Sequence, residues 1–203
     1  MKIDHKKELK HLYAASAKAP VLVDVPDMNF LMIDGTGNPN NSESYVQAVE
    51  ALYTTSYAAK FHVKKDLQGD DYSVMPLEGL WWTDNPADFS VDNKAAWKWT
   101  MMQMQPDLVT PEVIAVARER AEKKLGRDTS AVRFAAFHEG RAAQILHVGP
   151  YSEELPTIQA LHEFVANNGL KLRDKHREIY LSDPRRSAPE KLKTILRHPV
   201  EAA

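Results

Sequence analysis

Phe30-Leu31-Met32-Ile33-Asp34-Gly35 and Gln144-Ile145-Leu146-His147-Val148-Gly149 are the two stretches that decide the fold. Each is an apolar run of strand length that ends in glycine, and a loop and a helical pattern follow each one. Two more matched pairs follow in the same order: Leu77-Glu78-Gly79-Leu80-Trp81 with Arg177-Glu178-Ile179-Tyr180-Leu181, and Trp97-Lys98-Trp99-Thr100-Met101-Met102 with Lys191-Leu192-Lys193-Thr194-Ile195-Leu196. Strand, helix, strand and strand therefore occur twice, which indicates an internal duplication.

Helical patterns lie between these strands. Ser44 and Gln47 form a capping box before apolar residues at helical spacing, which predicts a helix over about 45–61. Thr110 before Pro111, with Gly126 as the C-terminal cap, predicts a largely charged surface helix over 111–125. A third helix is expected after Tyr151, and Asn167-Asn168-Gly169 ends it.

The remaining ordered segments are predicted as strands, after a charged, helical lead-in of about 20 residues. They are a strand pair at 72–83 and 96–105 separated by Asp84-Asn85-Pro86, a hairpin of 132–138 and 142–148 around Glu139-Gly140-Arg141, and two last strands at 176–181 and 193–198. We predict an α+β fold forming one domain over 1–203. Duplicated β-α-β-β repeats, about 20–106 and 130–200 with a connecting helix at about 110–126, would form a pseudo-two-fold antiparallel sheet. Helices would cover one side, with a ligand groove at the repeat junction.

Composition excludes several classes of function. Twenty-eight acidic and 26 basic residues give a net charge of −2, so the chain lacks the basic field that nucleic-acid binding requires. Cysteine is absent, which excludes disulfides and thiolate metal sites. The N-terminus is charged, and no apolar run approaches the ~18 residues of a membrane span. We expect a cytoplasmic protein with no nucleic-acid or membrane partner, and the composition leaves the oligomeric state open.

Common catalytic and cofactor motifs are absent from the sequence. Gly35-Thr36-Gly37 follows a predicted strand, but Asn40 occupies the third glycine position of a dinucleotide-binding fingerprint. The eight histidines show no paired metal-ligand spacing, so no metal or cofactor is expected. Without a Gly-x-Ser-x-Gly elbow or a P-loop, a serine hydrolase and a nucleotide-driven enzyme are also disfavoured.

Over about residues 20–200 the chain resembles the stand-alone branch of the GyrI-like small-molecule-binding proteins. The motifs that carry the resemblance are 52–61 (LYTTSYAAKF), 76–82 (PLEGLWW), 97–100 (WKWT) and 178–184 (EIYLSDP). The family is related to the drug-binding domains of multidrug-responsive transcription regulators, but no helix-turn-helix segment is seen before residue 20. The resemblance implies a groove for flat, often cationic aromatic compounds with a buried glutamate at its floor. For the stand-alone branch it also implies hydrolysis of cyclopropane-bearing DNA-alkylating natural products of the yatakemycin and duocarmycin kind.

Glu178 is the predicted centre of this groove. It alternates with His176 and Tyr180, so the three side chains share one strand face. A spiro-cyclopropane conjugated to a dienone needs an activated water for ring opening, which Glu178 as base and Tyr57 as hydrogen-bond partner would provide. The alternative is that Glu178 only pairs with an arginine on a solvated sheet face.

Aromatic and apolar side chains are the predicted walls. Trp82, Trp99 and Met101 are placed on the groove, and Trp81 and Trp97 are assigned to packing. Tyr151, after the Gly149-Pro150 turn, is a further ligand-binding candidate; packing at the helix entry is its alternative role. The competing function for the whole groove is a multidrug-binding or sensing module without turnover.

Overall fold

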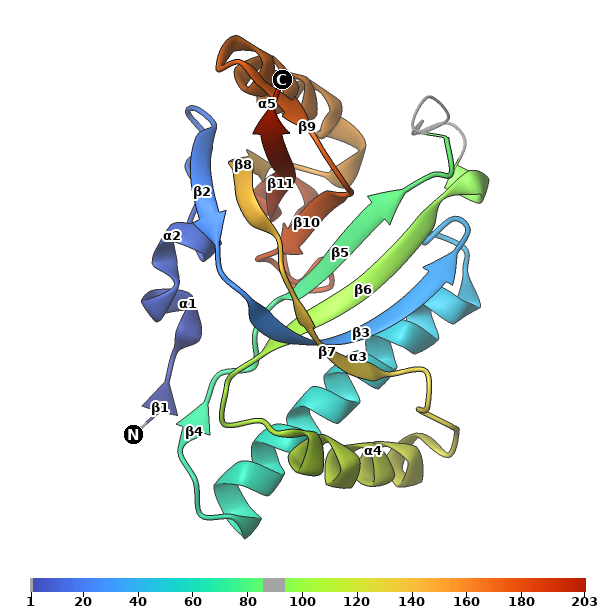
Figure 1. The fold of residues 1–203 in the computed structure, drawn as a ribbon. Helices are drawn as coiled ribbons and strands as arrows, with labels where there is room; N and C mark the ends of the chain where they lie inside the picture. Colours follow the sequence, from blue (N-terminus) through green and yellow to red (C-terminus); the bar gives the residue numbers. More distant parts are fainter. Residues whose placement is uncertain (1, 86–93) are drawn as a thin grey trace. The chain divides into compact units, whose positions relative to one another are not determined.

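The computed structural model describes residues 2–85 and 94–203 (Figure 1). Internal contacts divide the chain into two compact units. Unit 1 comprises Met1–His5, Met28–Leu77 and Trp81–Phe137; unit 2 comprises Lys6–Asp27, Glu78–Leu80 and His138–Ala203. Among the described residues, no helix combines the length and apolar character needed to cross a bilayer. Pro86, the last residue of the turn predicted after the strand at 72–83, lies outside the described residues.

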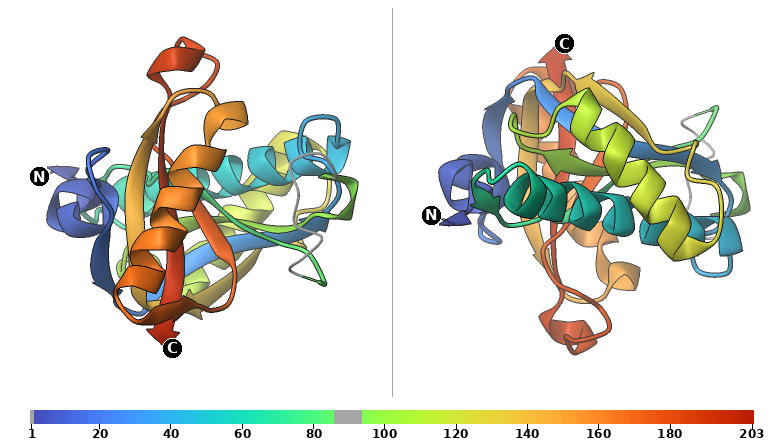
Figure 2. Two further views of the ribbon diagram at one scale, coloured as in Figure 1. Left: turned by 90° about the horizontal axis from the view of Figure 1, so that it is seen from above. Right: turned by 90° about the horizontal axis from the view of Figure 1, so that it is seen from below.

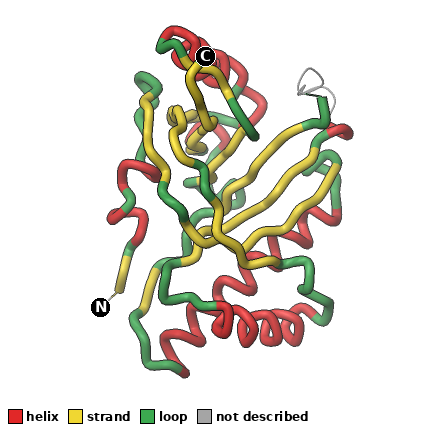
Figure 3. The backbone as a smooth tube through the Cα atoms, in the orientation of Figure 1, coloured by secondary structure: helices red, strands yellow, loops and turns green. Residues whose placement is uncertain are grey.

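Unit 1 is a sheet with two helices on one side. Its strand β3 (Met28–Thr36) pairs antiparallel with β6 (Lys98–Gln105) on one edge and with β7 (Arg133–Phe137) on the other. The long helix α3 (Glu43–Phe61) packs on β3 and β6, and α4 (Pro111–Leu125) packs beside α3. Figure 2 shows these two helices next to each other, and Figure 3 shows both on the same side of the strands. The smaller elements of unit 1 are β1 (Lys2–Ile3), η1 (His62–Asp66), β4 (Asp71–Tyr72) and η3 (Lys94–Ala96).

Both helices of unit 1 were expected, but one cap differs. The Ser42 side chain, rather than the predicted Ser44, accepts the Tyr45 N–H, so α3 begins at Glu43. The Gln47 amide donates to Glu43 Oε1 at 2.8 Å, so the predicted capping box is wrong. In α4 the Thr110 hydroxyl caps the start and a left-handed Gly126 ends it, as predicted. This helix buries Val113, Ile114, Ala117 and Ala121, so only its charged side is a surface.

Gly35 is required where a tryptophan crosses the sheet of unit 1. Gly35 on β3 is the register partner of Trp99 on β6, and the indole of Trp99 is fully buried. A Cβ atom at position 35 would fall inside the van der Waals radius of that indole, at 2.6 Å from its Cζ3 atom. The Trp99 ring also packs edge-on against Tyr45 of α3, with centroids 5.3 Å apart. Only glycine at position 35 leaves room for the Trp99 ring.

Unit 2 has antiparallel strands covered by one helix. Strand β8 (Gly140–Val148) pairs antiparallel with β2 (Val21–Val25) and β11 (Lys193–Ala202), and β11 pairs antiparallel with β10 (His176–Tyr180). Helix α5 (Leu155–Asn167) packs on β8 and β11. Its buried face joins the apolar cluster of Ala143, Ile145, Leu161, Val165, Leu196 and Val200. The smaller elements of this part of the chain are α1 (His5–Glu8), α2 (Lys10–Tyr13), η4 (Tyr151–Glu153), β9 (Leu170–Leu172) and η5 (Pro189–Lys191).

The predicted hairpin around Glu139-Gly140-Arg141 is wrong, although both strands exist. β7 pairs with β3 in unit 1, whereas β8 pairs with β2 and β11 in unit 2. The Glu139 carboxylate is buried and accepts hydrogen bonds from two arginines. The segment between β7 and β8 is therefore part of the core of unit 2 and is not an exposed turn. Strand β2 had no prediction, and the expected helical lead-in is limited to α1 and α2.

The predicted order of strand, helix, strand and strand occurs in both halves of the sequence: β3-α3-β5-β6 and β8-α5-β10-β11. The strand β5 (Leu77–Trp82) is divided, since its ends belong to unit 1 and its middle, Glu78–Leu80, to unit 2. The hydrogen-bonded order is β5-β6-β3 in one half and β10-β11-β8 in the other. In each half the third strand therefore lies between the second and the first. The fold is α+β and antiparallel ladders dominate it.

A network of buried charges crosses unit 2 on the face of β10 that carries Arg177. The Arg177 guanidinium donates to Glu78 Oε2 (Nε, 2.8 Å) and to Glu139 Oε2, and Arg197 on β11 also donates to Glu139 Oε2, at 3.2 Å. Tyr13 donates its hydroxyl hydrogen to Glu78 Oε1 at 2.8 Å. All four charged side chains are fully buried. Two positive and two negative charges therefore compensate each other without solvent.

We expect Gly35→Ala to destabilise the protein by about 1–3 kcal/mol, because the methyl group must displace the Trp99 ring. Chemical denaturation monitored by circular dichroism measures the loss. The same substitution in a Trp99→Leu background should cost clearly less. Equal costs in the two backgrounds would show that the indole is not the constraint.

We expect Arg177→Met to cost about 3–5 kcal/mol of stability, because it leaves Glu78 and Glu139 buried with too little positive charge. The matched control is Arg185→Met, which removes an exposed arginine paired with Asp183 and should change stability by about 0.5 kcal/mol or less. Similar unfolding midpoints for the two variants would contradict a supporting role for the network.

Candidate functional site

The alternation of β10 separates its charged side chains into two sets. Arg177 joins the buried network, and His176, Glu178 and Tyr180 share the other face. The Tyr180 hydroxyl donates to Glu178 Oε2 at 2.8 Å, and His176 Nε2 lies 3.5 Å from Glu178 Oε1. The Glu178 side chain is 13% exposed. The three residues that the sequence placed on one strand face are thus in contact around a single carboxylate.

Glu178 differs in its partners from Glu78 and Glu139, two fully buried glutamates of unit 2. Glu78 and Glu139 are neutralised by Arg177 and Arg197. Within residues 2–85 and 94–203, no lysine or arginine forms an ion pair with Glu178, whose partners are a phenol and an imidazole. Its negative charge is therefore not cancelled by a fixed cation, and it is held in position by the Tyr180 hydrogen bond.

Aromatic and apolar surface lies next to this carboxylate. The ring of Tyr151, in η4, meets the ring of Tyr180 edge to face, with centroids 5.8 Å apart. Tyr151 is 38% exposed, and Val148 and Leu155 on either side of it in the sequence are exposed too. An exposed tyrosine packed on the tyrosine that holds Glu178 can offer a stacking surface to a flat ligand.

Two further histidines of unit 2 lie close to His176. The His198 ring on β11 is centred 5.9 Å from that of His176 and 5.8 Å from that of His162 on α5. Burial lowers the pKa of His198 to about 3, and the charges of His176 and His162 lower it further. Burial and then the charge of His176 also lower the pKa of His162. Both rings are therefore uncharged at neutral pH.

The other predicted site residues belong to unit 1. Tyr57 on α3 is 46% exposed and stacks on Phe61, while Trp82 is half-buried at the end of β5. Trp99 and Met101 are fully buried core residues, so a ligand could touch them only if the core opened. Trp81 and Trp97 pack against each other at 5.5 Å, which confirms their assignment to packing.

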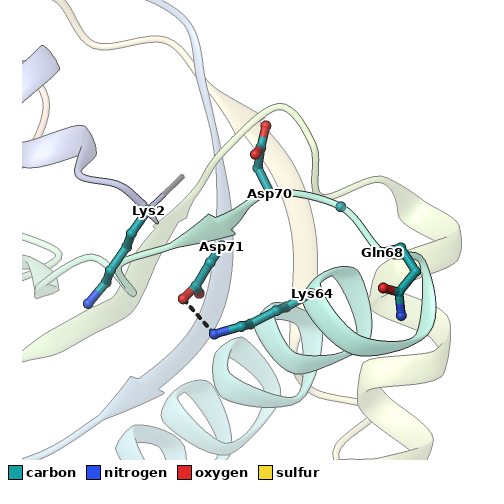
Figure 4. Close-up of a pocket in the computed structure, with 6 residues that line it drawn as sticks. Lys2, Lys64, Gln68, Asp70 and Asp71 are labelled. Carbon is teal, nitrogen blue, oxygen red and sulfur yellow. Dashed lines mark hydrogen bonds and ion pairs between the residues drawn. The ribbon is translucent and has the colours of Figure 1, made fainter.

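A charged hollow of about 450 Å³ lies elsewhere in unit 1 (Figure 4). It is lined by Lys2, Lys64, Gln68, Gly69, Asp70 and Asp71. Lys64 Nζ donates to Asp71 Oδ2 at 2.8 Å, and Lys60 lies 3.1 Å from the other oxygen, which holds the pKa of Asp71 down at about 2. No aromatic side chain lines this hollow. It does not suit a flat aromatic ligand.

Sequence reasoning missed both the buried network and the histidine pair beside His176. Tyr13, Glu78, Glu139, Arg177 and Arg197 are far apart in the sequence, and no local spacing distinguishes them from surface charges. His162 and His198 likewise have no shared motif. Across the described ranges, no group of three histidine, aspartate or glutamate residues is arranged to hold a metal ion.

The sequence pattern and the fold of this chain recur in other proteins. A family model for the GyrI-like small molecule binding domain matches residues 18–201. An uncharacterized conserved protein from Listeria innocua is 46% identical, covers 98% of this chain and 100% of its own, and has a TM-score of 0.91. Two structures described as hydrolases from Listeria innocua are 43% and 44% identical, with TM-scores of 0.88 and 0.84. They cover 99% and 98% of this chain and 100% of their own.

None of the curated proteins matches this sequence. The family model nevertheless spans nearly the whole chain, and relatives above 40% identity share the complete fold. Together with the antiparallel α+β architecture described above, these matches show that the chain belongs to the GyrI-like small-molecule-binding family.

Proposed function

We propose that this protein binds planar, often cationic aromatic compounds and hydrolyses cyclopropane-bearing DNA-alkylating natural products, with Glu178 as the base that activates water. The observation that carries the proposal is a sheltered carboxylate with no lysine or arginine partner in the described part of the chain, beside two tyrosine rings. Such a group is available both to balance a cation and to accept a proton.

Ligand binding follows from the charge and the rings. A flat cation bound at Glu178 would cancel a negative charge that the protein itself leaves uncancelled. The exposed ring of Tyr151 would contribute stacking, and an aromatic face also attracts a cation directly. We also propose Trp82, Trp99 and Met101 as ligand-binding residues, as the sequence predicts.

Hydrolysis requires a water molecule aligned with the strained ring. The water oxygen bonds to the cyclopropane methylene carbon, the ring C–C bond breaks, and its electron pair moves into the dienone, which becomes a phenolate. Glu178 takes the proton from the water and later releases it, so the phenolate is protonated and the net change is the addition of one water. In this proposal Tyr57 hydrogen-bonds the oxygen on which negative charge develops.

Relatives support an enzymatic function. Two proteins that are 43% and 44% identical over their whole length are named hydrolases, without a stated substrate. The repeated strand-helix-strand-strand order supports the further proposal that the domain arose by duplication.

A second candidate function is ligand binding without turnover, as a multidrug-binding or sensing module. It is favoured by the family description, which names small-molecule binding alone, and by the ability of Glu178 to balance a cation without chemistry. Incubation with a cyclopropane-bearing alkylator separates the two functions. Mass spectrometry should detect many product molecules per protein, each heavier by one water. Stoichiometric binding without this product would favour the sensor.

We expect Glu178→Gln to abolish turnover, because the amide keeps the volume and loses the base. The free energy of unfolding should stay within about 0.5 kcal/mol of wild type. Initial rates of water addition measure the effect. Glu163→Gln, on the exposed face of α5, is the control and should keep the wild-type rate. Wild-type rates in Glu178→Gln would remove Glu178 from the mechanism.

Trp82→Ala and Trp99→Ala should behave differently, since the first indole is half-buried and the second fully buried. For Trp82→Ala we expect a loss of about 1–3 kcal/mol in planar-ligand binding with near-native stability. For Trp99→Ala we expect a loss of about 3–5 kcal/mol in stability. Calorimetric titration and chemical denaturation measure the two quantities. Unchanged affinity in Trp82→Ala would return that indole to a packing role.

A further inference from the structure

Three histidines from three elements of unit 2 meet next to Glu178. His162 comes from α5, His176 from β10 and His198 from β11, and the His198 ring contacts both of the others. His162 Nε2, His176 Nε2 and His198 Nδ1 are buried atoms that make no hydrogen bond to any described residue. Of the three rings, His176 is the one that faces a carboxylate, with its Nε2 3.5 Å from Glu178 Oε1.

This arrangement decides where the cluster takes up a proton. An imidazolium at His176 would be stabilised by the adjacent Glu178 carboxylate. Burial disfavours the charged form of both His198 and His162, and a charged His176 would repel a proton on either ring. Both effects lower the pKa values of His198 and His162. Of the three rings, His176 is therefore the one beside which the geometry places a compensating negative charge.

The arginines on β10, on β11 and in the segment before β10 have partners elsewhere. Arg177 and Arg197 bind Glu78 and Glu139 on the opposite face of the sheet. Arg173, in the segment before β10, binds Asp174 and the Glu139 carbonyl. On its own strand His176 meets Glu178, which Tyr180 also holds. Glu178 and His176 thus form a charge pair whose net charge depends on one proton.

We propose that His176 determines which ligand charge the candidate site selects. As a neutral imidazole it leaves the Glu178 carboxylate with a full negative charge, which favours cationic aromatic ligands. As an imidazolium it cancels that charge, and the site then favours uncharged ones. This proposal rests on the proposed function, in which Glu178 faces the ligand.

The first test needs no ligand and no change at His176. NMR of the histidine ring protons follows each titration in wild type and in Glu178→Gln. Removal of the carboxylate should lower the pH midpoint of His176 by at least about half a pH unit. The midpoint of His138, which is exposed and paired with Asp27, should stay the same. An unchanged His176 midpoint would overturn the proposal.

The second test measures selectivity with two flat probes that do not titrate, the cation N-methylacridinium and the neutral 9-anthracenemethanol. In wild type the acridinium affinity should fall about 10-fold from pH 8 to pH 5.5, whereas the affinity for the neutral probe should stay constant. In His176→Gln the acridinium affinity should change less than about 2-fold. The matched control His138→Gln should keep the wild-type dependence.

The outcomes separate this proposal from the function on which it rests. A 10-fold fall that persists in His176→Gln would overturn the role of His176 and leave the proposed function standing. Acridinium binding that is equal in wild type and Glu178→Gln at pH 8 would instead overturn the proposed function. The NMR titration would then still decide whether His176 and Glu178 are coupled.

Discussion

The contact of Arg177 and Arg197 with a single carboxylate oxygen of Glu139 is the interaction on which unit 2 depends. The two arginines are direct register partners on β10 and β11, a placement of like charges that is unfavourable by itself. Glu139 Oε2 accepts a hydrogen bond from both, and Glu78 takes the remaining side of Arg177. Because buried charges are tolerated only when paired, this arrangement fixes the register of the two strands. A slip of β10 by one residue would turn Arg177 toward α5 and Glu178 toward the charged network.

The network therefore also gives Glu178 its chemistry. Glu78 and Glu139, two fully buried glutamates of unit 2, are both neutralised by arginine. The guanidinium groups of Arg177 and Arg197 are paired with glutamates on one face of the sheet. The opposite face of β10 carries a carboxylate, a phenol and an imidazole, and among the described residues no arginine or lysine forms an ion pair with Glu178. The same strand thus carries a structural charge cluster and a candidate reactive group, one residue apart.

Much of this could be predicted from local sequence, and the exceptions have a common physical cause. Thr110, Pro111 and Gly126 determine the ends of α4 through hydrogen bonds within a few residues, so the prediction was confirmed. The alternation of His176, Glu178 and Tyr180 likewise places them together without knowledge of any partner strand. The hairpin at Glu139 was wrong because strand pairing depends on distant segments, here β3 for β7 and β2 and β11 for β8. Trp99 could not be separated from Trp82 by spacing, since the space above Gly35 that buries it exists only after β3 and β6 pair.

The buried network also has a consequence for how the chain folds. Arg197 donates to the carbonyl oxygen of Leu12, a contact between residues 185 positions apart, and Tyr13 reaches Glu78 across 65 positions. Forming such a contact closes a very long loop, and the loss of chain entropy precedes any stabilisation by the contact. This entropy loss slows folding. Until the contacts of Tyr13 and Arg197 form, the other charged groups of the network are incompletely paired. We expect those groups to stay hydrated up to that point. We therefore expect the core of unit 2 to lose its water late and in one cooperative step, and its amide hydrogens to exchange together.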